Sequence, residues 1–208
     1  YHSDYASKEE ATKAGNALKP QGIVVHSTGC NNQFLARYVA PCDDDPNKDA
    51  IIAELGRNIY ANSWNRPGVD KLVHFMVGYG AKKEDGATVA QLEPCDLKCG
   101  GVGPGTKGSY NNSHIQFEIL EDDLTDEAYF NEAFGKAVEL CVYLCREYGL
   151  SAADICSHKE AAERGYGWQH FDPENWLHIY GKDMDWYFVS NDDGAQKQFR
   201  VFDMNSVR

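Results

Sequence analysis

The sequence lacks the features that place a chain in a membrane. No apolar run approaches the roughly 18 consecutive residues that a membrane-spanning helix needs. The amino-terminal segment YHSDYASKEE is polar and has no hydrophobic region of a signal peptide. It begins with Tyr1 rather than Met, so the sequence leaves open whether further residues, including a removed signal peptide, precede it.

Positive charge is also scarce. The 208 residues contain 20 Lys and Arg against 32 Asp and Glu, a formal net charge of −12. A nucleic-acid-binding domain shows a basic patch or stripe, and an anionic membrane surface repels a negative chain. We therefore expect neither nucleic-acid nor membrane partners. The 42% hydrophobic and 12% aromatic residues are enough to build the core of one folded domain.

The seven cysteines contain no Cys-x-x-Cys pair and are odd in number, so neither a redox motif nor a disulfide framework is indicated. Cys141 and Cys145 lie four apart in a helical pattern, where free thiols behave as small apolar side chains. Cys95 and Cys99 lack the second pair that a zinc knuckle requires. We expect reduced cysteines, with one local disulfide at Cys95 and Cys99 as the alternative.

Two further patterns fail the requirements of the sites that they suggest. GGVGPGTKGS, residues 100–109, lacks the Gly-Lys-Ser/Thr ending of a phosphate-binding loop. DDDPNKDAIIAE has acidic residues near the spacing of a calcium-binding loop, but Lys48 occupies the position of its turn glycine. We interpret the first segment as a flexible loop. In the second, we expect Asp45 to cap a helix that has Pro46 at its first position.

The periodicity of apolar residues predicts alternating strands and helices. Strands are expected at 22–28, 71–79, 87–94, 113–120 and 153–158, with the second and third forming a hairpin. Helices are expected at 46–63 and 126–149, and Gly149 is a plausible end for the second. This order predicts an α/β fold, with a central mixed β-sheet flanked by helices.

Histidines stand where two of these strands end. His26 ends the apolar strand GIVVHST, and His158 follows the strand ADIC after one Ser. Open α/β sheets place ligands at strand ends, so the two histidines can converge if the strands are neighbours. With Asp172 from the returning loop, they would leave a fourth tetrahedral position for water, as in a catalytic zinc site. No compact His-Glu-x-x-His motif is present, and the residues alone leave open whether 157–173 is a metal-binding loop or a polar surface loop.

One strand carries a carboxylate on a polar face. SHIQFEIL alternates cleanly, so that one side of the strand is apolar and the other is polar. The polar side consists of His114, Gln116 and Glu118, opposite Ile115, Phe117 and Ile119.

Four segments together resemble a known family: GIVVHSTGCNN, VHFMVGYG, NNSHIQFEI and ICSHKEAAERGYGWQHFDPENW. They occur in the order seen in type 2 zinc N-acetylmuramoyl-L-alanine amidases, which share their fold with peptidoglycan-recognition proteins. The similarity is greatest to amidase domains of clostridial-type endolysins and autolysins, and it covers residues 20–180. It implies a bacteriolytic hydrolase that acts on the amide between N-acetylmuramic acid and L-alanine, with one Zn²⁺ per chain.

The resemblance also implies roles for individual residues. The implied zinc ligands are His26, His158 and Asp172. Glu118 matches the general base. His170 stands where many members have Lys, and we interpret it as a substitute electrophile. Val73 stands where some members have Tyr, so Glu118 has to serve as the base.

The implied substrate is an extended glycopeptide, for which we expect an open groove. The candidates for lining it are Asn58, Asn62, Trp64, His74, Asn112, Tyr166 and Trp168. For the two tryptophans, ordinary packing is the alternative, because an indole buries a large area.

We expect residues 1–181 to form the catalytic domain. Residues 182–208 would be a cap or the start of a linker to a wall-binding module, because anionic wall polymers repel a chain with this charge. The resemblance places its action at the bacterial cell wall, after secretion or phage-type lysis. Two alternatives remain at this point: a non-catalytic peptidoglycan-binding protein on the same fold, and a zinc peptidase that cuts within the stem peptide.

Overall fold

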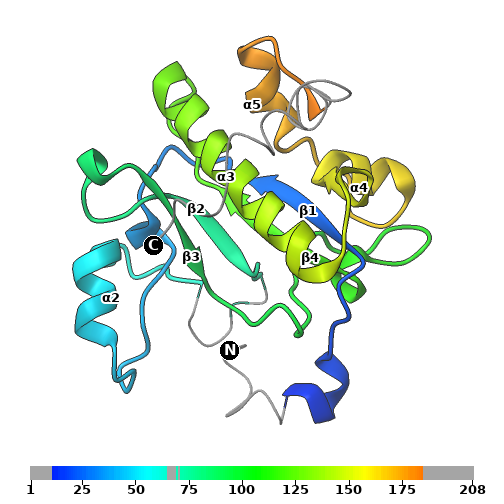
Figure 1. Cartoon of the computed structure of the whole chain (residues 1–208), viewed down its shortest axis with the longest axis horizontal. Coiled ribbons are helices and arrows are strands. Elements are labelled where there is room, and N and C mark those ends of the chain that lie inside the picture. The colour runs from blue at the N-terminus through cyan, green and yellow to red at the C-terminus, as the bar shows by residue number, and fades with distance from the viewer. Residues whose placement is uncertain (1–10, 65–68, 70, 185–208) are drawn as a thin grey trace.

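The computed structural model describes residues 11–64, 69 and 71–184, so the C-terminal segment predicted from residue 182 lies outside the described residues from position 185 onward. Five strands form one sheet in the order β3-β2-β4-β1-β5 (Figure 1). They are β1 (Gly22–Ser27), β2 (Phe75–Tyr79), β3 (Ala87–Gln91), β4 (His114–Ile119) and β5 (Ile155–Ser157). Four strands are parallel and β3 pairs antiparallel with β2, so the sheet is mixed, as predicted.

Helices and short helical turns connect the strands. The α-helices are α2 (Lys48–Leu55), α3 (Glu127–Tyr148), α4 (His158–Arg164) and α5 (Glu174–Ile179). A π-helical turn is η1 (Thr12–Asn16), and the 3₁₀ turns are η2 (Leu35–Arg37), η3 (Lys83–Asp85), η4 (Tyr110–Asn112) and η5 (Ala152–Asp154).

The long helix α3 covers one face of the sheet (Figure 1). It begins at Asp126, whose side chain accepts a hydrogen bond from the Tyr129 amide at 3.0 Å, and it ends at Gly149 in the left-handed conformation. These are the ends expected for a capped helix. Its apolar stripe packs on the side chains of β1 and β4 that point the same way, among them Phe117. The prediction for 126–149 is confirmed.

The opposite face of the sheet carries both apolar and polar side chains. Val24 and Cys156 pack against Ala161 of α4 there. His26 follows Val24 by two residues and is paired with Glu118 in the parallel register of β1 and β4. Because side chains alternate along a strand, His26 and Glu118 project from this same face.

The predicted helix at 46–63 is much shorter in the structure. Helix α2 ends at Gly56, where φ is 91°, a conformation that glycine adopts at little cost. Ile59, expected on the apolar stripe, is 78% exposed. The prediction that Asp45 caps this helix was also wrong, because the helix begins after Asn47. Asp45 instead accepts a hydrogen bond from the Asn47 amide at 2.8 Å, which forms an Asx turn ahead of the helix.

No disulfide joins any of the seven cysteines, which all lie among the described residues, and five of them are buried. Cys95 and Cys99 are therefore not joined by a disulfide. Within the described ranges, no helix combines the length and the apolar character needed to cross a membrane.

Candidate active site

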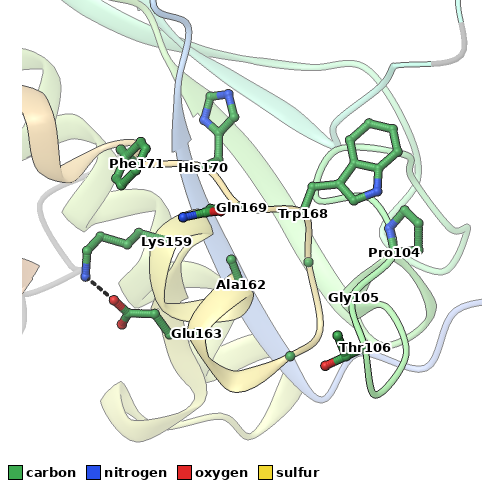
Figure 2. Close-up of a pocket in the computed structure, with 12 residues that line it drawn as sticks. Pro104, Gly105, Thr106, Lys159, Ala162, Glu163, Trp168, Gln169, His170 and Phe171 are labelled. Carbon is green, nitrogen blue, oxygen red and sulfur yellow. Dashed lines mark hydrogen bonds and ion pairs between the residues drawn. The ribbon is translucent and has the colours of Figure 1, made fainter.

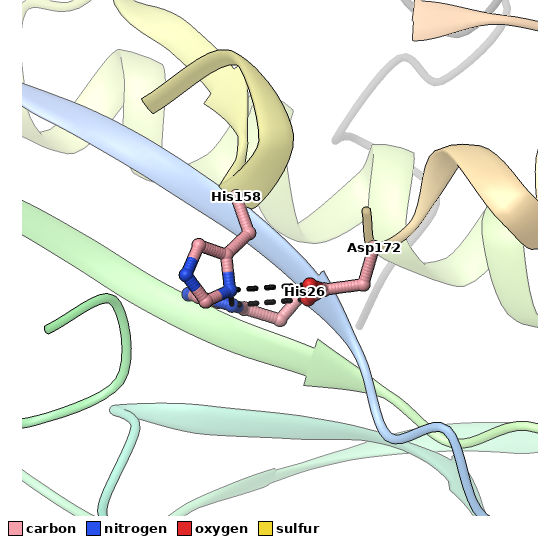
Figure 3. Close-up of side chains that lie close together, drawn as sticks. All are labelled: His26, His158 and Asp172. Atoms are coloured by element: carbon pink, nitrogen blue, oxygen red, sulfur yellow. Dashed lines mark hydrogen bonds and ion pairs between the residues drawn. The ribbon is translucent and has the colours of Figure 1, made fainter. Parts of the chain in front are cut away.

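Three segments that are distant in sequence deliver His26, His158 and Asp172 to one place (Figure 3). β5 lies beside β1 and runs parallel to it, so the two strands end at the same edge of the sheet. His26 is near the end of β1, and His158 is the first residue of α4, directly after β5. Asp172 comes from the loop between α4 and α5.

A capping box turns β5 into α4 at the position of His158. The Ser157 hydroxyl accepts a hydrogen bond from the Glu160 amide at 2.9 Å, and the Glu160 carboxylate accepts one from the Ser157 amide at 2.9 Å. This reciprocal pair satisfies the free amides of the first helical turn. The sequence SHKE therefore fixes where the His158 side chain leaves the sheet.

The three side chains converge with the spacing of ligands around one ion. The Nδ1 atoms of His26 and His158 are 3.1 Å apart. Asp172 Oδ2 lies 3.2 Å from His26 Nδ1, and Asp172 Oδ1 lies 3.1 Å from His158 Nδ1. Tetrahedral ligands at zinc bond lengths of about 2.0–2.1 Å stand about 3.3 Å apart. The donor set of two imidazoles and a carboxylate fits zinc.

Gln116 fixes the tautomer of His26. The amide nitrogen of Gln116 donates to Asn111 Oδ1 at 2.9 Å and to the Cys99 carbonyl at 3.3 Å. Its oxygen therefore faces His26 and accepts a hydrogen bond from Nε2 at 3.1 Å. With the proton on Nε2, the lone pair of Nδ1 points at His158 and Asp172, as a metal ligand requires.

The carboxylate of Asp172 is held ionised. Burial raises the pKa of Asp172, but hydrogen bonds from His158, His170 and His26 outweigh burial and keep the pKa well below its usual range. The Ser27 amide also donates to Asp172 Oδ2 at 3.3 Å.

The pKa values of the two histidines of the cluster are shifted in opposite directions. Burial lowers the pKa of His158, which favours the neutral imidazole. Burial also acts to lower the pKa of His26, but the hydrogen bond to Asp172 and the charges of Glu118 and Asp172 raise it overall. In the metal-free chain a proton therefore competes for the position between these residues, and binding of a metal should release it.

Glu118 lies on the same face of the sheet beside His26. Its Oε2 atom is buried and has no hydrogen-bond partner within the described part of the chain. Burial, with the charges of Asp172 and Glu121, raises the pKa of Glu118 to about 7 against the opposing effect of His26. A carboxyl group with a pKa near neutrality can both accept and donate a proton.

His170 stands at the mouth of the cluster. Its Nδ1 makes a short hydrogen bond to Asp172 Oδ1, and its ring stacks on His158 with centroids 4.8 Å apart. The hydrogen bond to Asp172 raises the pKa of His170 against partial burial, which favours the charged imidazolium. The side chain is 61% exposed, so its second ring nitrogen remains available to a substrate.

The structure places the seven groove candidates in different surroundings. His74 has no exposed surface: its Nε2 bonds to the Leu97 carbonyl at 2.8 Å, and burial lowers its pKa to about 4. His74 is therefore an interior hydrogen-bonding residue and has no exposed surface that could line a groove. Trp64 is partly buried and packs edge-on against Tyr38. Asn58 donates to the Arg37 carbonyl at 3.0 Å within a loop.

Two further candidates lie at the wrong end of the strands. Asn112 and Tyr166 line a polar cavity of about 570 Å³ together with Gln21, which precedes β1. Glu118 lies four positions further along β4 than His114, which is at this end, and about 13 Å away from it. Of the other two candidates, Asn62 has a side-chain oxygen that is buried without a partner in the described ranges, and Trp168 lines a cavity shared with His170.

The sequence places Gln116 on the polar side of β4 with Glu118 but does not indicate its role. Alternation within one strand cannot tell which strand lies next to it, and the role depends on β1 being that neighbour.

An α/β sheet in which two histidines and an aspartate converge where parallel strands end, beside a buried glutamate, is the arrangement expected of a metal-dependent hydrolase. Residues 16–175 match the family Amidase_2, described as N-acetylmuramoyl-L-alanine amidase. The chain belongs to this family. It is an amidase that hydrolyses the bond between N-acetylmuramic acid and L-alanine in peptidoglycan.

Solved structures share the fold at low sequence identity. The Staphylococcus aureus hydrolase AmiA, solved in complex with its ligand, is 19% identical with a TM-score of 0.52, over 81% of this chain and 69% of that chain. PlyL is 16% identical with a TM-score of 0.51, over 83% and 84%. The catalytic domain of XlyA is 21% identical with a TM-score of 0.50, over 79% and 83%. No curated protein sequence matches the chain.

Proposed function

We propose that the chain is a zinc-dependent amidase in which His26, His158 and Asp172 hold one Zn²⁺. The observation that supports this proposal is the convergence of three ligand atoms, all within 4.8 Å of one another, from three separate segments. The ionised carboxylate and the oriented lone pair of His26 suit a divalent cation.

Zinc bound there would supply a Lewis acid that activates water near neutral pH and polarises the substrate carbonyl. Glu118 then takes the proton from the attacking water and passes it to the leaving amine. His170 donates a hydrogen bond from its exposed ring nitrogen to the carbonyl oxygen, where negative charge develops in the transition state. Val73 is fully buried in the apolar core, which leaves Glu118 as the proposed base.

Replacing Gln116 tests the proposed ligand set without measuring turnover. In Gln116→Leu, His26 loses the partner that holds its proton on Nε2, so we expect zinc affinity to fall by roughly 10- to 100-fold. Gln116→Glu keeps an acceptor for His26 and should bind zinc more tightly than the Leu variant. Competition titration with a chromogenic chelator measures both. Equal zinc affinity in wild type and Gln116→Leu would remove Gln116 from this role.

Glu174 offers a test of stability against pH in the metal-free chain. Burial raises its pKa to about 7 despite a hydrogen bond from the Ser157 hydroxyl at 2.5 Å. The unfolded chain ionises at about 4.3, so folding loses stability as pH rises from there to 7. Glu174→Gln should therefore match wild type near pH 4 and exceed it by roughly 1–3 kcal/mol at pH 8. Urea unfolding at both values measures this, and an equal difference at both would contradict it.

The enzyme acts on the bacterial cell wall, and we propose that it reaches the wall by secretion or by phage-type lysis. A net charge of −12 opposes adhesion to anionic wall polymers. We further propose a separate wall-binding module beyond residue 208 that adds avidity. Lysis of Gram-positive cells by this chain and by a longer native form, compared at physiological salt, tests it, and equal lysis would count against the module.

A further inference from the structure

Trp168 is exposed close to the proposed catalytic residues. Its side chain is 60% exposed, although tryptophan is a residue that proteins usually bury to a large extent. It precedes His170 by two residues, and Figure 2 shows the indole of Trp168 and the imidazole of His170 rising from the same side of the chain. An aromatic surface therefore stands next to the group that we place on the substrate carbonyl.

The indole is seated on a glycine. A Cβ atom added at Gly103 would lie 2.6–3.0 Å from three indole atoms of Trp168, so one ring face rests directly on the backbone there. The Trp168 amide also donates to the Val102 carbonyl at 2.9 Å. The packed face and the backbone bond hold the ring in place, and this fixed orientation reduces the entropy that a ligand must overcome on binding.

A cavity of about 410 Å³ lies beside the indole, between α4, residues 104–106 and residues 165–171 (Figure 2). This volume is in the range of small-ligand sites. Trp168, Phe171 and Pro104 give it apolar surface, while Thr106 and Gln169 bring neutral hydrogen-bonding groups. The ammonium of Lys159 in its wall is already paired with Glu163 at 2.5 Å.

We propose that Trp168 and this cavity bind one pyranose ring of the peptidoglycan glycan strand, which stacks its apolar face on the indole. This proposal rests on the proposed function. The amide that is hydrolysed is attached to N-acetylmuramic acid, so this sugar must lie beside His170 when the amide is in the active site. Both basic side chains in its wall are already paired, Lys159 with Glu163 and His170 with Asp172, which favours an uncharged ring over the carboxylates of a stem peptide. Thr106 and Gln169 would bind its hydroxyl or N-acetyl groups.

The test separates sugar from peptide with ligands that carry no amide to cut. N-acetylglucosamine oligomers, peptide-free glycan chains and free stem peptide are each titrated into the metal-free chain and the zinc-loaded chain by calorimetry. Trp168→Ala should weaken glycan binding roughly tenfold and leave peptide binding unchanged, and Trp168→Phe should restore part of it. Tyr143→Ala, which removes a 49% exposed aromatic on α3, is the matched control and should bind as wild type.

Gly103→Ala gives a second, independent variant, because the added methyl group displaces the indole without removing it; it should weaken glycan binding in the same direction. On intact peptidoglycan, Trp168→Ala should raise KM with kcat unchanged, the mark of lost ground-state binding. Unchanged glycan binding in Trp168→Ala, or loss of peptide binding instead, would overturn the proposal. Because binding is also measured without metal, failure of the zinc mechanism alone would leave this result intact.

Discussion

Glu118→Gln should lower kcat by roughly 10²- to 10⁴-fold, the contribution of a positioned general base. The amide keeps the size of the side chain but cannot take a proton from water. Zinc affinity and the unfolding midpoint should stay close to wild type, since Glu118 is not among the proposed ligands. Release of stem peptide from purified peptidoglycan, followed at saturating substrate, measures the loss.

Glu132→Gln is the matched control for this variant. Glu132 accepts hydrogen bonds from the Ala87 amide at 2.6 Å and from the Tyr79 hydroxyl at 3.1 Å, on the side of the sheet that α3 covers. Its conversion should leave kcat unchanged. If Glu118→Gln kept more than about a tenth of wild-type kcat, another group would have to be the base.

The same residue predicts the acid limb of the pH profile. The pKa of Glu118 is raised to about 7 in the chain without metal, and a base acts only in its ionised form. Activity should therefore fall as pH decreases through this pKa. A neighbouring cation favours the carboxylate, so in the zinc-loaded enzyme the limb should lie below 7. The pH profile of the residual activity of Glu118→Gln should not show this acid limb.

Asp172→Asn should lower zinc affinity by roughly 10²- to 10³-fold, because binding free energies of about 10–16 kcal/mol in zinc sites are shared among four ligands. The variant keeps the shape of the side chain and removes the charge that His26, His158 and His170 share. Zinc at 100 times its Kd should stabilise wild type by about 2.7 kcal/mol. At the same zinc concentration, zinc should increase the stability of Asp172→Asn only slightly.

Thermal unfolding with and without zinc, together with metal content by mass spectrometry, measures this effect. Asp44→Asn, at an exposed position in the turn ahead of α2, is the control and should respond to zinc as wild type does. A full zinc response in Asp172→Asn would show that the ion binds elsewhere.

Local patterns predicted the elements that have clear ends and one dominant face. Helix α3 is bounded by Asp126 and Gly149 and carries one apolar stripe, and the structure matches the prediction within a residue. The alternation of β4 also placed Glu118 on the polar side. By contrast, the helical pattern at 46–63 continued past Gly56, whose backbone conformation ends α2 whatever the periodicity of the apolar residues that follow.

The site depends on information that periodicity does not contain. His26 and His158 meet because β5 is the neighbour of β1 in the sheet, and strand order is set by packing across the whole domain. The groove candidates Asn112 and Tyr166 are near Glu118 and His170 in sequence, yet they lie beyond the other end of the strands. Nearness in sequence could not say at which end of β4 a residue would lie.

The most direct test of the zinc amidase is mass spectrometry of the fragments that the chain releases from purified Gram-positive peptidoglycan. We expect free stem peptides that begin with L-alanine, together with glycan that carries no peptide. Both should disappear when a chelator removes the metal and return when zinc is added. Fragments cut within the stem peptide, or release that persists in the chelated enzyme, would contradict it.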